Sequence, residues 1–331
     1  GSPIYKGRVG TTDASIVSEL KQRGAVLLGK TQTTAFAYRA PPPTRNPRDL
    51  EHTPGGSSSG SAAAVAAGMV PFAVGEQTLG SVLRPASYCG VTGFKPTYGL
   101  LSMQGVLPLA PSLDTLGFFT HTPGDMVALW RTIGQPGSDV EPTEIGVPEP
   151  ALDVEPEMAA AYARTISILR AAGVKTIPLD IRSLLTELVG AARTVMFFEG
   201  ARFHAERYKQ YGDRLGDLAS LVREGLKMTP DAYAQSKQVI AQSRDRFDEI
   251  YQKAPIIVVP AATGPAPLGL AFTGDTRMNS PWTALGVPAI SIPVTVHAGL
   301  PLGLQLTANR NGDSQLLRAA AEMQSLLGAQ T

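Results

Sequence analysis

The sequence lacks several features that would place it in a familiar class of protein. It has one cysteine in 331 residues, so no internal disulfide can form, and a reducing cytoplasm is expected. Lys plus Arg total 29 and Asp plus Glu total 28, and this balance predicts no nucleic-acid partner. No apolar run approaches the roughly 20 residues of a membrane span, and the first residues do not resemble a signal peptide. The prediction is a cytoplasmic protein that binds neither nucleic acid nor a membrane.

Cysteine and histidine, two common catalytic residues, are also scarce. Cys89 lies in an apolar stretch, which predicts a buried packing residue rather than a nucleophile. The histidines, at positions 52, 121, 204 and 297, stand in no recognisable triad, so ordinary loop or surface positions are predicted for them. We predict no metal site and no cofactor.

The sequence as a whole is 43% hydrophobic, and helical stretches alternate with extended stretches along it. Strands that alternate with helices predict an α/β fold around a largely buried sheet. Residues 39–56, rich in Pro, Arg and Gly, predict a loop, and residues 90–102 predict a strand edge between two turns. Helices are predicted at 13–23, 61–68 and 316–327, and strands at 25–29, 70–74, 174–181, 255–262, 288–296 and 300–308.

The predicted secondary structure changes in the middle of the chain. Residues 155–253 consist mostly of long helical stretches, with a single predicted strand between the first two. The strands after this segment need partners, and the apolar stretches before it can supply them. We therefore predict a single domain over residues 1–331, with a helical excursion at 155–253.

Two short motifs match well-known patterns but stand in the wrong context. Residues 24–31, "GAVLLGKT", have the spacing of a phosphate-binding loop, yet four apolar residues occupy the place of its flexible turn. Residues 56–60, "GSSSG", have the spacing of a nucleophile elbow around Ser58, which must follow a buried strand. The preceding "LEHTPGG" is no strand. Neither nucleotide binding nor a nucleophilic Ser58 is predicted.

Two loops rich in glycine and serine carry the strongest signal. The first, "TPGGSSSGSAAAVAAG" at 53–68, runs into helix-forming alanines, and the second is "GEQTLGSVLRPASYCG" at 75–90. This pair resembles the amidase signature family of serine hydrolases, as do "GAVLLGKT", "RNP", "GFKPTYGLLS" and "GVLPLAPSLDTLG". The segment "SVLRPA" is similar to the corresponding segment of the malonamidase-like branch of this family. The resemblance implies a three-layer α/β/α fold whose central mixed sheet is flanked by helices.

The resemblance also implies a role for each loop. Ser81 is the expected nucleophile, which becomes acylated. Ser57 is the expected bridging serine, preceded by a cis peptide bond, which passes the Ser81 proton onward and returns one to the leaving amine. The hydroxyls of Ser57 and Ser81 are expected within hydrogen-bond reach of each other.

Further residues of the second loop are expected to bind the substrate. The backbone N–H groups of Thr78, Leu79, Gly80 and Ser81 are expected to form an oxyanion hole. Arg84 is expected to anchor a substrate carboxylate or carbonyl, and its alternative role is a structural salt bridge beneath the loop.

Three substitutions depart from the family pattern. Leu79 stands where Gly is usual, Glu76 replaces a usual Thr and is expected to bring negative charge near the site, and Ser59 replaces a usual Gly. The family's basic Lys lies in a strand upstream of the segment that "GSPIYKG" resembles, and this sequence does not contain that strand. Lys30 and Lys95 lie in other motifs of the family. The chain as given is therefore not expected to hydrolyse amides at an enzymatic rate.

Three functions follow as hypotheses. The first is an amidase that hydrolyses a small carboxamide, without a metal or cofactor and with a homodimer as its expected assembly. The second is a transamidating protein like the A-type component of glutamyl-tRNA amidotransferase, which works with partner chains. The third is a degenerate or truncated family member that serves as a binding or structural protein.

Overall fold

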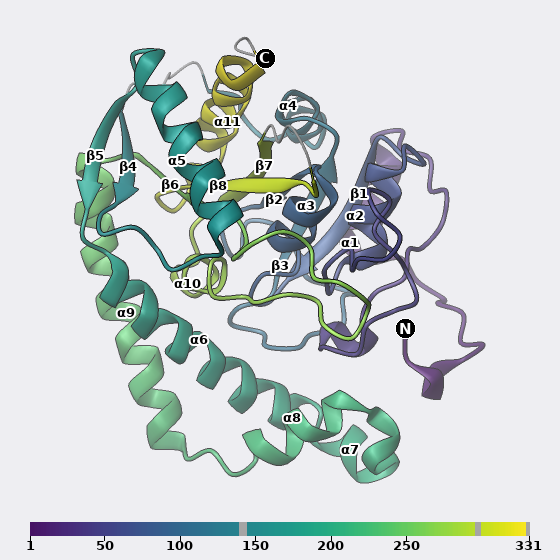
Figure 1. Ribbon diagram of the computed structural model, residues 1–331. Coiled ribbons are helices and arrows are strands. Elements are labelled where there is room, and N and C mark those ends of the chain that lie inside the picture. The colour runs from purple at the N-terminus through teal and green to yellow at the C-terminus, as the bar shows by residue number, and fades with distance from the viewer. Residues whose placement is uncertain (139–143, 295–298, 329–331) are drawn as a thin grey trace.

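One mixed sheet runs through the molecule (Figure 1). The computed structural model describes residues 1–138, 144–294 and 299–328, and the strands in them form an eight-stranded sheet in the order β1-β3-β2-β7-β8-β6-β4-β5. The predicted α/β fold with a central mixed sheet flanked by helices is thus confirmed. The strands are β1 (Phe72–Gln77), β2 (Thr92–Lys95), β3 (Thr115–Thr120), β4 (Glu144–Pro148), β5 (Lys175–Leu179), β6 (Ile256–Pro260), β7 (Ala289–Val294) and β8 (Leu302–Ala308).

Helices cover both faces of the sheet, and this explains the continuous apolar strands. In β6, Ile256 and Val258 face one hydrophobic core, whereas Ile257 and Val259 face another. A strand buried on both sides cannot alternate between polar and apolar residues. The helices are α1 (Ser15–Gln22), α2 (Ser59–Ala66), α3 (Leu83–Cys89), α4 (Pro123–Thr132), α5 (Pro156–Ala171), α6 (Arg182–Phe203), α7 (Ala205–Tyr211), α8 (Asp217–Gly225), α9 (Pro230–Lys253), α10 (Ser280–Leu285) and α11 (Asp313–Gly328).

The predicted helical excursion divides into two parts. Its first part belongs to the sheet layers, because α5 packs on β6 and β8, and β5 pairs in parallel with β4 at one end of the sheet. Helices α6 to α9 then extend beyond the sheet and pack on one another (Figure 1). Since all the strands described share one sheet, we propose that the chain is a single domain.

The prediction of a buried strand over residues 25–29 is wrong. The segment forms no strand, and the side chains of Val26, Leu27 and Leu28 are 81%, 58% and 72% exposed. The sheet ends at β1, and no described strand runs beside this segment. Apolar side chains favour a strand only where a neighbouring strand takes up the backbone hydrogen bonds.

Other predicted elements lie close to the observed ones. The strand predicted at 70–74 is β1, shifted toward the C-terminus, and the helix predicted at 61–68 begins at Ser59. The predicted strand edge within 90–102 is β2, which pairs on both sides, with β3 and β7, and is therefore an interior strand. The last residues of the strand predicted at 288–296 lie outside the described residues. No helix in the described residues is both long and apolar enough to cross a membrane.

Candidate active site

The two glycine- and serine-rich loops meet at the end of β1. The first loop leads into α2, and the second connects β1 to α3. The Ser58 amide donates to the Ser81 carbonyl over 3.3 Å, and Arg84 Nη2 donates to the Gly56 carbonyl over 2.6 Å. The two loops are therefore joined by one backbone hydrogen bond and by the side chain of Arg84.

Three of the four clustered serines have structural roles. Ser58 Oγ donates to the Glu76 carbonyl and accepts from the Glu76 amide, each over 3.2 Å, and Ser61 Oγ donates to the Val74 carbonyl over 2.8 Å. These hydroxyls take the place of a neighbouring strand along the free edge of β1. Ser59 Oγ donates to the Gly55 carbonyl over 2.7 Å and so closes its own turn.

The hydroxyls of Ser57 and Ser81 are different. Both side chains are buried, at 6% and 8% exposed, and neither hydroxyl forms a hydrogen bond within the described part of the chain. The Gly56–Ser57 peptide bond is cis, the geometry that the resemblance implies. The predicted hydrogen bond between the two hydroxyls is absent. Since nothing holds either group, each can turn among the three staggered positions of a serine side chain.

Gln77 and Thr283 hold the turn that follows β1, and the sequence patterns gave neither of them a role. Gln77 Oε1 accepts from the amides of Val82 and Leu83 over 2.9 and 3.1 Å, and Nε2 donates to Thr283 Oγ1 over 2.9 Å. The turn between them is thus closed by a single amide side chain. The sequence feature that could have identified the role of Gln77 is its position directly before the predicted oxyanion segment.

The turn leaves four successive backbone donors without a partner among the described residues. The amides of residues 78 to 81 donate to no acceptor in the described residues. Gly80 is required by space, because an added Cβ would lie 2.6 Å from Asn279 Oδ1 and 2.9 Å from Arg84 Nη1. The Leu79 side chain packs against the core shared with α6. The oxyanion role of Thr78, Leu79 and Gly80 stays a prediction.

Arg84 lies beneath the loops and binds carbonyl groups. Its side chain is buried, and besides the bond to Gly56 its Nε donates to the Thr273 carbonyl over 2.6 Å. It forms no ion pair within the described residues, so the predicted structural salt bridge is replaced by hydrogen bonds to carbonyls. Arg84 Nη1 has no partner among the described residues. This nitrogen is closed off from solvent, and the anchoring role stays a prediction.

Replacing Arg84 with Met is expected to destabilise the fold strongly. The change leaves the buried carbonyls of Gly56 and Thr273 without donors, and hydrogen bonds from a charged group contribute about 1.5–3 kcal/mol each. We expect a loss of about 3–5 kcal/mol in the free energy of unfolding, measured by urea denaturation. Arg84→Lys, which can serve one carbonyl, is the matched variant and should lose less. A loss for Arg84→Met within experimental error would show that these bonds do not support the loops.

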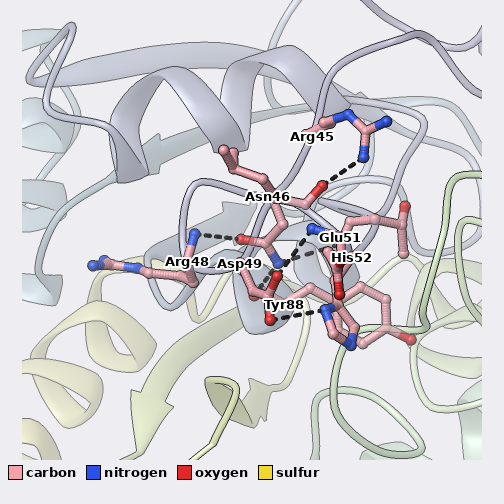
Figure 2. Close-up of polar contacts among 9 residues, drawn as sticks. Arg45, Asn46, Arg48, Asp49, Glu51, His52 and Tyr88 are labelled. Carbon is pink, nitrogen blue, oxygen red and sulfur yellow. Dashed lines mark hydrogen bonds and ion pairs between the residues drawn. The ribbon is translucent and has the colours of Figure 1, made fainter.

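A polar network anchors the loops from behind (Figure 2). Asn46 Nδ2 donates to the carbonyls of Tyr88 and Thr53 over 2.9 and 3.2 Å, and therefore ties the end of α3 to the start of the first loop. Its Oδ1 accepts from the Arg48 amide over 3.0 Å, and Arg48 Nε donates to the Cys89 carbonyl over 2.9 Å. The "RNP" motif is thus structural in this chain.

The lysines of the family motifs do not reach the serines. Lys30 is exposed. Lys95 is fully buried, and its Nζ donates to the carbonyls of Pro96 and Val287 over 2.7 and 2.8 Å. Burial lowers the pKa of Lys95 to about 7. Neither lysine forms a hydrogen bond with Ser57 or Ser81.

The histidines and the cysteine are also separate from the serines. His52 Nδ1 lies 3.2 Å from Asp49 Oδ2 (Figure 2). His121 is exposed. The predicted loop or surface position is wrong for His204, which is buried against the Pro108 carbonyl and Arg207, and burial lowers its pKa to about 4. Residue 297 lies outside the described residues. Cys89 is buried as predicted, which raises the pKa of its thiol to about 12.

The negative charge expected from Glu76 stays a prediction. Burial and the neighbouring Asp114 raise the pKa of Glu76 well above its usual value. The shift favours the protonated acid more than in an exposed glutamate. Within the described part of the chain, no group of three or more His, Cys, Asp or Glu residues could hold a metal ion.

Comparisons with known proteins agree with this arrangement. A family model described as Amidase matches residues 1–317. The A-type component of the glutamyl-tRNA(Gln) amidotransferase of Treponema pallidum (strain Nichols) is 33% identical over 390 residues, a match that covers 97% of this chain and 77% of the relative. Its counterpart in Exiguobacterium sp. (strain ATCC BAA-1283 / AT1b) is 32% identical over 376 residues, with 96% and 78% covered.

Solved structures show the same fold. One described as a crystal structure of amidase superposes with a TM-score of 0.88 at 27% identity and covers 96% of this chain and 78% of that one. The A-type component of the glutamyl-tRNA(Gln) amidotransferase of Thermotoga maritima superposes with a TM-score of 0.82 at 29% identity, with 97% and 78% covered.

Proposed function

The chain belongs to the amidase family, and we propose that it hydrolyses the C–N bond of a small carboxamide through an acyl-enzyme on Ser81. The observation that carries the proposal is the pairing of two features in the joined loops. Ser57 and Ser81 are mostly buried residues whose hydroxyls have no partner among the described residues, and the amides of residues 78 to 81 beside them are donors without acceptors there. Amide hydrolysis needs both a nucleophile and donors for the charge that develops on oxygen.

The chemistry divides into acylation and deacylation. Ser81 Oγ attacks the amide carbon, its proton moves to Ser57 and on to a base, and the carbonyl electron pair shifts to the oxygen. Backbone N–H groups of the turn bind that oxyanion, and one such donor typically lowers the barrier by about 2.7–4 kcal/mol. When the oxyanion collapses, the C–N bond breaks, and the nitrogen takes a proton through Ser57. Water then hydrolyses the ester on Ser81 by the same steps.

The buried nitrogen of Arg84 that has no partner among the described residues supports a second part of the proposal. Arg84 Nη1 lies beside Gly80, in the turn that carries the oxyanion donors. A buried donor without a partner is unfavourable until a ligand or water satisfies it. We assign Arg84 the binding of a substrate carbonyl or carboxylate through this nitrogen, in addition to its hold on the two loops.

A transamidating component of a larger amidotransferase is the second candidate. It is favoured by the relatives, since several that are about 30% identical are named as the A-type component of a glutamyl-tRNA(Gln) amidotransferase. The deciding experiment measures ammonia release from small amides by the chain alone. Release without a partner protein supports the amidase, whereas release that requires partner chains supports the amidotransferase. An assembly as a homodimer in the cytoplasm stays a prediction from the sequence.

A binding or structural protein is the third candidate, and it is favoured because no lysine, histidine or carboxylate in the described residues is hydrogen-bonded to Ser57 or Ser81. The discriminating measurement is mass spectrometry of the intact chain after incubation with a reactive amide or a fluorophosphonate. An adduct on Ser81 supports either enzyme. Complete absence of an adduct, also in the presence of an added base, contradicts both enzymes and leaves the binding protein.

A further inference from the structure

Two carboxyl groups meet beside the turn of residues 78 to 81. Glu76 lies near the end of β1, and Asp114 directly precedes β3, the antiparallel neighbour of β1. The Thr78 hydroxyl lies between them, 2.7 Å from Asp114 Oδ1 and 3.2 Å from Glu76 Oε1. Because β1 and β3 fix both backbones, the carboxyl groups are held together by the sheet itself.

The Thr78 hydroxyl has one proton to give and two carboxyl oxygens beside it. Asp114 Oδ2 accepts from the amides of Leu109 and Ala110 over 2.8 and 2.9 Å, and Oδ1 receives the Thr78 hydroxyl. Asp114 is thus surrounded by donors, as an anion requires. Glu76 has no amide donor to its side chain among the described residues, and Thr78 has only one hydroxyl proton to give. A proton on Glu76 completes the chain from Glu76 through Thr78 to Asp114.

The surroundings also favour a protonated Glu76. Helix α2 and strand β3, which pack against β1, carry no ionisable side chain. Asp114 faces Glu199 of α6, another carboxylate, and Tyr98 faces both of these acids. Neither Glu76 nor Asp114 forms an ion pair within the described residues. Burial raises the pKa of Asp114 to about 6, and it raises the pKa of Glu76 well above the usual value.

We propose that Glu76 is a positioning residue, whose proton links it through Thr78 to Asp114 and thereby holds the turn of residues 78 to 81. The inference rests on the proposed function only for what this turn does, which is to bind the oxyanion. The two carboxyl contacts are the only hydrogen bonds of the Thr78 side chain to described residues. Loss of the proton leaves two carboxylates around one hydroxyl, and their repulsion displaces Thr78 and the donors that follow it.

The first test compares the wild-type chain with Glu76→Gln, which keeps the shape and a donor but cannot ionise. Between the usual pKa of 4.5 and its raised value, folded Glu76 holds a proton that the unfolded chain releases. The stability of the wild type therefore falls as the pH rises through this interval and levels off above it. The melting temperature of Glu76→Gln minus that of the wild type should grow by about 2 °C per pH unit there. Glu187→Gln, on an exposed position of α6, is the matched control and should show a constant difference.

The second test follows the turn itself. The amide resonances of residues 78 to 81 in the wild type should shift together as the pH rises, with the midpoint found by the melting measurements. In Glu76→Gln these resonances should stay in place over the same range. In Thr78→Val, which lacks the bridging hydroxyl, they should no longer follow the titration of Glu76.

Each outcome decides one part of the inference. A constant melting difference between wild type and Glu76→Gln, like that of the control, overturns the retained proton. A growing difference with unmoved resonances of residues 78 to 81 keeps the proton but overturns the positioning role. Failure of the proposed function shows itself elsewhere, as a Ser81 that no reagent acylates, and leaves both measurements readable.

Discussion

A fluorophosphonate is expected to modify Ser81 and no other residue. Ser81→Ala should abolish the adduct, since it removes the attacking oxygen. Ser57→Ala keeps that oxygen but removes the group that passes its proton on, and the rate of labelling should fall by about 10²–10⁴-fold. Mass spectrometry of proteolytic peptides locates the adduct, and its growth with time gives the rate.

The other serines and the cysteine provide the counter-tests. Ser325→Ala, at an exposed position of α11, is the matched control and should label like the wild type. An adduct on Ser58 would contradict the assignment, because the Ser58 hydroxyl is engaged with the backbone of β1. An adduct on Cys89 would contradict it too, since that thiol is buried and its pKa is raised to about 12.

The chain of 331 residues is expected to hydrolyse amides far more slowly than an amidase that has a base. Within the described part of the chain, no lysine, histidine or carboxylate is hydrogen-bonded to Ser57 or Ser81. A serine hydroxyl is a weak nucleophile near pH 7 unless a base takes its proton. General acid–base catalysis contributes about 10²–10⁴-fold, so we expect at least about a 10²-fold deficit in turnover. Ammonia release from a small amide measures it.

Supplying a base should restore turnover. Imidazole or a small primary amine in the buffer should raise the acylation rate in proportion to the concentration of its unprotonated form, and Ser57→Ala should remove most of this gain. If residues that precede Gly1 in a longer chain bring a lysine to Ser57, that chain should turn over at least about 10²-fold faster, and Lys→Ala there should reverse the gain. Rapid turnover by the 331-residue chain without added base contradicts this account and indicates a base elsewhere within it.

Local patterns allowed much of the fold to be predicted. Strands β6 and β7 were identified because their apolar, β-branched runs fit a position buried on both faces. The helix after the serine loop was identified from its alanines. The failed prediction at residues 25–29 shows the limit of such patterns, because an apolar run does not reveal whether a partner strand lies beside it.

For the candidate site, too, some features follow from the sequence and others only from the tertiary structure. The sequence by itself predicted Ser57 and Ser81 as the reactive residues of segments 53–68 and 75–90, since the resemblance rests on short local motifs. Only the tertiary structure decided the roles of the side chains around them. Arg84 finds its carbonyl partners 28 and 189 residues away in the sequence.

Glu76 gives the clearest case of this division. From the sequence alone, a glutamate predicts a negative charge, because an isolated carboxyl group ionises well below pH 7. Its partner Asp114 directly precedes the neighbouring strand β3, and Thr78, which bridges the two, follows the end of β1. Ionisation depends on burial and on nearby charges, which a strand pairing brings together and a linear sequence does not display. The sequence therefore determined which residues occupy the two segments, and the folding of the sheet decided which carboxyl groups lie together and which hydroxyls stay free.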